Sequence, residues 1–200
     1  MNPGEFRWLI DILELVEVEI GVYEWRQKKR IWSKMEHLTT NCVYSKNGIS
    51  ARSARFTIES RHEITLHNAL ALAPPGTGHF FLADINREKP GFYVLSTAVI
   101  APVTCEAERT KTVTGALNRP ETEKLQPLIF PGYLTEKYLR QTQDAPMSYS
   151  ETRYVLITPK AIGIQTGELV DIGGALYETV IPHVLDPWKN EYEILERKDN

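Results

Sequence analysis

The chain has 200 residues, of which 42% are hydrophobic and 24% charged, and this composition is typical of a folded globular protein of one large or two small domains. A formal net charge of −3 argues against a broad nucleic-acid-binding face, and two cysteines exclude a disulfide framework. The longest uncharged run, 90–105, is shorter than a membrane helix, and early charges argue against a signal peptide, so we expect a soluble protein.

The N-terminal segment 6–20 fits two patterns. Its apolar residues match a helical stripe, but they also alternate as in a strand, first through 6–12 and then, after a phase slip, through 16–20. A β-bulge absorbs such a slip, and we favour one long strand. The basic run 26–30 that follows is expected in a solvated hairpin or loop.

Two short helices are expected, one in each half of the chain. Ser33 and Glu36 form a capping-box pattern at the start of 33–42, in which apolar side chains then share a helical face. The segment 134–144 occupies the equivalent place in the second half, with Thr135 as its cap.

The stretch Pro-Pro-Gly-Thr-Gly at 74–78 resembles part of a phosphate-binding loop. The loop needs a first glycine, a lysine and a hydroxyl, but Ala73, His79 and Phe80 stand at those positions. The following segment 79–85 is rich in aromatic and β-branched residues, which favours a strand rather than the required helix. We therefore interpret 74–78 as a turn between strands, matched by a Gly-Gly turn at 172–174.

The two halves of the chain resemble each other. The segment 54–66 aligns with 152–164, 78–85 with 174–181 and 92–96 with 192–196, in the same order. This repeat predicts a mainly β protein with two tandem small β-barrel or sandwich-like modules, 1–101 and 102–200, each with one short helix. Alternation predicts these buried residues: Phe56, Ile58, Phe81 and Val94 in the first module, and Tyr154, Leu156, Tyr177 and Ile194 in the second.

Few residues suggest chemistry. His62 and His67 are five apart, so on a strand they point to opposite faces and make a poor metal site with Glu63. His183 and Asp186 are better explained by a loop closed at Asp186 and anchored by Trp188. We expect no catalytic, cofactor-binding or metal-binding residue, and no enzyme activity.

The segment 42–54 is the candidate contact loop. It is rich in small and polar residues and carries Lys46, Asn47 and Arg52 without an acidic residue. Long loops of this kind are functional or disordered. As a functional loop it contacts a partner ring or lines a channel, where its cations meet DNA phosphates without base selectivity. The alternative is a disordered surface loop.

The order of elements resembles the head–tail joining family of tailed phages, the head-closure or stopper proteins. MNPGEFRWLIDI (1–12) is similar to the family's opening, and 23–38 to its hairpin return with a Trp strand. The segment 51–70 is similar to its central strand pair, and 167–199 to its C-terminal strand–turn–strand–loop–strand order. Members of the family usually have a single module of about half this length.

The resemblance implies a structural virion protein in the neck of a phage. Such a protein is expected to form a ring, a hexamer, between a portal or adaptor ring above and a tail terminator or tail tube below. It seals packaged double-stranded DNA without reading its sequence and provides the tail-docking surface. It would assemble in the host cytoplasm, without a membrane or cofactor. A tail-terminator-type ring protein and a generic two-barrel binding module remain the alternatives.

Deletion of residues 45–50 tests the loop hypothesis. We expect folding to be preserved, because the segment lies between strands, and phage assembly to fail through DNA leakage or defective tail joining. The measurements are the unfolding transition of the purified protein and the titre of phage carrying the deletion. A wild-type titre would contradict a functional role.

Overall fold

The computed structural model describes residues 3–38, 52–62, 70–73, 78–87, 90–114, 119–138 and 152–197. These residues are mainly β-strand; they contain a 3-10 turn, Pro3–Glu5, but no α-helix. None of them forms a helix that could cross a membrane. The mainly β prediction is therefore confirmed.

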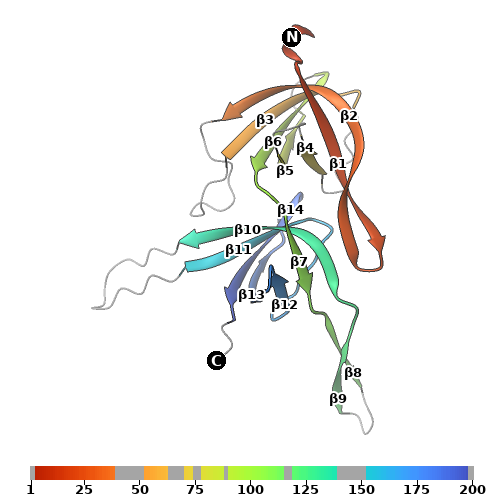
Figure 1. The fold of residues 1–200 in the computed structure, drawn as a ribbon, viewed down its shortest axis with the longest axis vertical. Coiled ribbons are helices and arrows are strands. Elements are labelled where there is room, and N and C mark those ends of the chain that lie inside the picture. The colour runs from red at the N-terminus through yellow and green to blue at the C-terminus, as the bar shows by residue number, and fades with distance from the viewer. Residues whose placement is uncertain are drawn as a thin grey trace, which may run out of the picture.

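The first β-unit is formed by six strands that lie in the upper half of Figure 1. They are β1 (Trp8–Glu19), β2 (Val22–Leu38), β3 (Arg52–Glu59), β4 (Leu70–Ala73), β5 (Phe80–Asn86) and β6 (Phe92–Val99). Their antiparallel pairing runs β1–β2–β3–β6–β5–β4 and returns from β4 to β1. No strand of this unit is therefore left without two strand neighbours.

The second β-unit repeats this order in the lower half of Figure 1. Its strands are β7 (Val103–Ala107), β10 (Leu128–Tyr138), β11 (Thr152–Pro159), β12 (Leu169–Ile172), β13 (Ala175–His183) and β14 (Lys189–Glu196). Pairing runs β7–β10–β11–β14–β13–β12 and returns from β12 to β7. A separate hairpin of β8 (Thr110–Thr114) and β9 (Pro120–Lys124) is inserted between β7 and β10.

The prediction of two short helices is wrong. Ser33–Leu38 continues β2, and 134–138 continues β10, whereas 39–42 and 139–144 lie outside the described residues. The Ser33 hydroxyl, which was expected to cap a helix, donates a hydrogen bond to the Trp8 carbonyl of the paired strand, 3.1 Å away. Pairing with two neighbouring strands outweighs the local capping signal, because tertiary contacts override weak propensities.

The long N-terminal strand is confirmed. The register of β1 against β2 shifts between Ile12 and Leu13 and again between Glu17 and Glu19, which accounts for the phase slip in the apolar pattern. The expected strand at 79–85 is also present as β5, although 74–77 lie outside the described residues. At the second expected turn, Gly173 and Gly174 both have positive φ angles, 64° and 88°, as a tight type I′ hairpin requires.

A shared β-bulge fixes how the two halves correspond. The register of β5 against β6 shifts between Leu82 and Asp84, and that of β13 against β14 shifts between Thr179 and Ile181. With the two bulges superposed, Tyr177 corresponds to Phe80. The sequence alignment had paired Tyr177 with Phe81 instead, which is one residue off and therefore on the opposite face of the strand.

Each unit encloses its own core, and the expected core residues are largely confirmed. Phe56 and Ile58 are buried in the first core, and Leu156, Tyr177 and Ile194 in the second. The other three expected residues differ: Val94 and Tyr154 are only half-buried, and Phe81 is buried in a third cluster outside both cores.

The β1–β2 hairpin links the two units. Leu15 belongs to the second core, and Tyr23 and Trp25 pack against it. At the hairpin turn the Gly21 carbonyl accepts a hydrogen bond from the Ile129 amide, 2.8 Å away. A strand pair of the first unit therefore supplies side chains to the core of the second.

Substitution of Gly21 by alanine tests this docking. Gly21 and Gly91 have almost equal positive φ angles, 77° and 79°, but a Cβ on Gly21 would lie 2.9 Å from the Pro127 carbonyl oxygen, whereas a Cβ on Gly91 meets nothing. Gly91→Ala should cost about 1 kcal/mol of unfolding free energy from backbone strain alone. Gly21→Ala should cost about 1–3 kcal/mol more. Equal losses in denaturant titrations would show that the turn does not pack on the second unit.

Candidate functional site at the joint between the units

The outward faces of the two units meet in a third apolar cluster. Phe81 of β5 and Ala98 of β6 pack there with Tyr133 of β10 and with Val155 and Ile157 of β11. Successive strand residues point to opposite faces, so Phe80 enters the first core while Phe81 enters the joint. In β5 and β11, burial on both faces explains the uninterrupted apolar runs 80–82 and 155–157.

Tyr133 is the centre of this joint. Its ring is fully buried, with its centroid 4.6 Å from that of Phe81 and 5.5 Å from that of His79. Its hydroxyl lies 2.6 Å from His79 Nε2. Aromatic pairs at such separations add to the stability gained from burial. The joint is therefore held by both ring packing and a hydrogen bond between the units.

The protonation states in the joint follow from burial. Burial lowers the pKa of His79 to about 4 and raises the pKa of the Tyr133 hydroxyl well above its ordinary value. The Trp25 indole acts in the opposite direction and lowers the pKa of the Tyr133 hydroxyl, although its buried Nε1 makes no hydrogen bond of good geometry. At neutral pH both side chains are thus uncharged. The Tyr133 hydroxyl can donate to His79 Nε2 when the imidazole proton is on Nδ1, and it can accept from Nε2 when the proton is there.

Trp188 makes a second polar contact between the units. It packs against the first core, and its indole N–H donates to Asp84 Oδ1 over 3.2 Å. Asp186 Oδ1 accepts from the amides of Trp188 and Lys189, over 2.7 and 3.2 Å. The expected loop closed by Asp186 and anchored by Trp188 is present at 184–188, whereas His183 ends β13, with its Nε2 3.2 Å from Glu193 Oε1.

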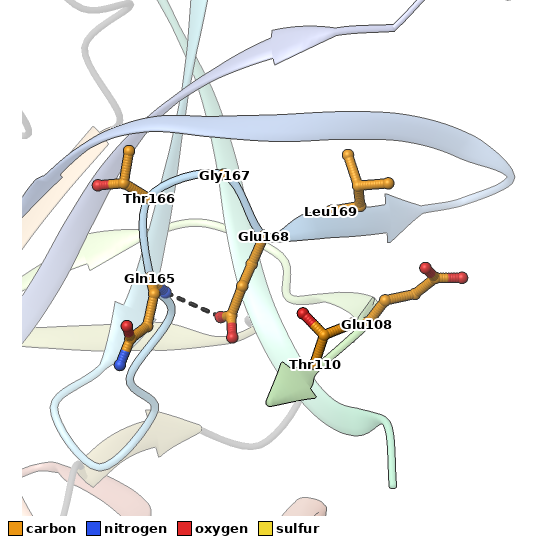
Figure 2. A pocket seen from close by; sticks show the side chains of 7 residues that line it. All are labelled: Glu108, Thr110, Gln165, Thr166, Gly167, Glu168 and Leu169. Carbon is orange, nitrogen blue, oxygen red and sulfur yellow. Dashed lines mark hydrogen bonds between the residues drawn. The ribbon is translucent and has the colours of Figure 1, made fainter. Parts of the chain in front are cut away.

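An open, polar hollow of about 320 Å³ lies on the second unit, beside the start of β8. Figure 2 shows its lining residues, Glu108, Thr110, Gln165, Thr166, Gly167, Glu168 and Leu169. The Glu168 carboxylate extends toward the loop 165–167 and accepts a hydrogen bond from the backbone N–H of Gln165, 2.8 Å away. The Glu108 carboxylate points away from that loop. The hollow therefore presents no converging pair of carboxylates.

The loop that lines the hollow is fixed by two side chains of β14. The Tyr192 hydroxyl donates to the Ile162 carbonyl at 3.1 Å and accepts from the Ile164 amide at 3.0 Å. Asn190 Nδ2 also donates to the Ile162 carbonyl, at 2.8 Å. Because Tyr192 and Asn190 are buried, these bonds hold the loop against the sheet.

The sequence-based candidates are not brought together. Lys46 and Asn47 lie outside the described residues, and Arg52 begins β3, with its Cα opposite that of Val99. Glu63 and His67 are also outside them. Among the described residues, no group of three or more histidine, cysteine or acidic side chains could hold a metal ion. Burial raises the pKa of Cys105 to about 12, so its thiol stays protonated.

Comparisons of the chain with family models, with curated proteins and with solved structures gave no match.

The joint predicts an acid-sensitive component of stability. Above pH 6.5 the imidazole of residue 79 is neutral in both the folded and the unfolded chain. As the pH falls from 6.5 to about 4, the unfolded chain takes up a proton there and the folded chain does not, so folding is weakened. We expect this to cost up to about 3 kcal/mol by pH 4.

The measurement is the unfolding free energy of wild type and His79→Gln across this pH range. The variant should lose less stability on acidification, because its amide can accept the Tyr133 hydrogen bond but does not titrate. Tyr133→Phe is the matched control: it lowers stability at every pH but keeps the imidazole. Parallel curves for wild type and His79→Gln would contradict the assignment.

Proposed function

We propose that the chain is a structural protein of a phage neck, a head-closure subunit built from two tandem small β-barrel modules. The modules are the two β-units, with a boundary near 101–102. The protein forms a ring, most simply a hexamer, between the portal or adaptor ring and the tail. The proposal assigns it no catalytic residue and no cofactor.

The observation that carries the proposal is the repeated strand order. Each β-unit consists of six strands whose pairing returns to its start, in the same connectivity and with a β-bulge at the corresponding point. Closure of the pairing is what a small barrel requires. Two such units agree with a duplicated form of the family that the sequence resembles.

The contacts between the units support a mechanical role for the subunit. The Tyr133 cluster, the Trp188–Asp84 hydrogen bond and the docked β1–β2 hairpin all join the two units within one chain. An interface with buried aromatic rings and paired polar groups restricts relative motion of modules. Such a subunit suits a neck ring, which must hold pressurised DNA and transmit the docking of a tail.

The oligomeric state tests this function. We expect native mass spectrometry of the purified protein to show a hexamer, or a monomer that becomes a ring only when the neighbouring neck rings are added. A tail-terminator protein would instead form rings on tail tubes. A stable monomer that does not bind to phage necks, and whose melting temperature rises when a small molecule is added, would favour a generic binding module.

A map of the assembled neck then tests how the modules are arranged. Six two-module chains place twelve modules in the neck, which would allow one subunit to meet both twelvefold portals and sixfold tails. Twelve modules at one radius and height would support this arrangement. Two separate tiers of six would contradict it and leave only the hexamer.

A further inference from the structure

The β8–β9 hairpin has no partner in the described part of its own chain. Its two strands pair only with each other, and it supplies no residue to any of the three apolar clusters. It projects from the bottom of the molecule in Figure 1. An isolated two-stranded hairpin is marginally stable in water, so docking on another surface would stabilise it.

The first β-unit shows how such a hairpin docks. The outer part of the β1–β2 hairpin occupies the same place in its unit, because β1 and β2 correspond to β7 and β10. Its turn lies against the start of β10, where Gly21 contacts Pro127 and accepts a hydrogen bond from Ile129. The chain therefore already contains one hairpin that is docked on the neighbouring unit.

The corresponding receiving stretch in the first unit can be located from the strand register. Met35 of β2 lies opposite Phe56, and Leu134 of β10 lies opposite Leu156. Phe56 and Leu156 occupy the same place in their strands, three residues before the last one. Met35 therefore corresponds to Leu134.

The same correspondence can be followed toward the start of β2 and β10, where it reaches the docking stretch. Ile31 of β2 then corresponds to Phe130 of β10, and each of them is buried opposite a core residue of the preceding strand. Counted from this pair, the docking stretch Pro127–Ile129 corresponds to Lys28–Arg30.

Charge points independently to the same stretch. Arg26, Lys28 and Arg30 alternate along β2 and are all exposed. Two carboxylates of β1 face this row, since Glu14 lies 2.8 Å from Lys28 and Asp11 accepts Arg30 at 2.9 Å, and Glu24 precedes Arg26 on the same face of β2.

One face of the projecting hairpin carries two carboxylates, of which Glu123 lies opposite Lys111 and Glu121 lies opposite the uncharged Val113. Glu121 and Glu123 share one face of β9, and both are exposed. Opposite charges on the donor and the receiving stretch favour association and set its register.

We propose that the β8–β9 hairpin of one copy docks on the Lys28–Arg30 stretch of β2 in a second copy. The contact is head-to-tail and repeats between chains the docking that already occurs within each chain. Such heterologous contacts close into a ring when the rotation permits. The inference rests on the proposed ring function and specifies the surface that builds it.

Cross-linking of two proteins, each with one introduced cysteine, tests the contact. One protein carries Glu123→Cys and the other Lys28→Cys, both with Cys42→Ser and with the buried Cys105 retained. A short bis-maleimide should give a covalent dimer from the mixture. The matched control replaces Lys28→Cys with Arg197→Cys, which also removes an exposed cation but lies at the end of the second unit.

A charge reversal supplies a second readout. Glu121 lies opposite Val113 in the hairpin, so Glu121→Lys creates no like-charge pair directly across the strands. We expect it to weaken self-association roughly tenfold, and added salt to weaken the wild-type protein as well. Glu196→Lys, another exposed reversal, is the control and should leave self-association unchanged.

The outcomes separate the two proposals. Dimer formation well above the Arg197→Cys control, together with weakening by Glu121→Lys, supports the contact. If native mass spectrometry shows a ring but neither effect appears, the hairpin contact is overturned and the ring function stands. If the protein is monomeric under all conditions, including with neck rings, both are overturned.

Discussion

The burial of Tyr133 between the two β-units is the constraint on which the rest of the structure depends. It requires β5, β6, β10 and β11 to be apolar on both faces, with one face for a core and the other for the joint. The strand that carries it is also crowded on its inner face. A Cβ on Gly132 would lie 2.6 Å from Cys105 Sγ and 2.8 Å from Leu156 Cδ1, so a side chain there would force the sheet apart.

Polar groups of His79, Tyr133 and Trp188 are paired across the joint, whereas the buried Trp25 Nε1 is not. His79 can accept from Tyr133 because it stays neutral, and Asp84 receives the indole N–H of Trp188 at an exposed edge. Burial of an unpaired charge would cost several kcal/mol. The two units are thus joined by hydrogen bonds between a neutral pair inside and a solvated pair outside, which makes their relative position specific as well as stable.

Strands were predictable from this sequence, but register was not. Alternation and glycine turns identified β1, β5, β12 and β13, whereas the helix at 33–42 was wrong because a capping pattern cannot reveal a neighbouring strand. The repeat alignment was one residue off in β5, which placed Phe81 in the core instead of the joint, and two residues off in β3, where Phe56 corresponds to Leu156 rather than Tyr154. The joint itself had a signal that alternation overlooked: the unbroken apolar runs 80–82 and 155–157 indicate strands buried on both faces.

The two hairpins differ in chemistry in the way that their proposed contacts require. Within the chain, Leu15 lies opposite Trp25, and both pack into the second core, as expected of a contact that forms once during folding. The β8–β9 hairpin begins instead with Thr110 opposite Lys124 and remains exposed. An apolar surface there would aggregate before assembly, whereas a charged one keeps the free subunit soluble and lets association respond to charge and salt. On the proposed contact, the difference between the two hairpins gives one permanent and one reversible copy of the same docking geometry.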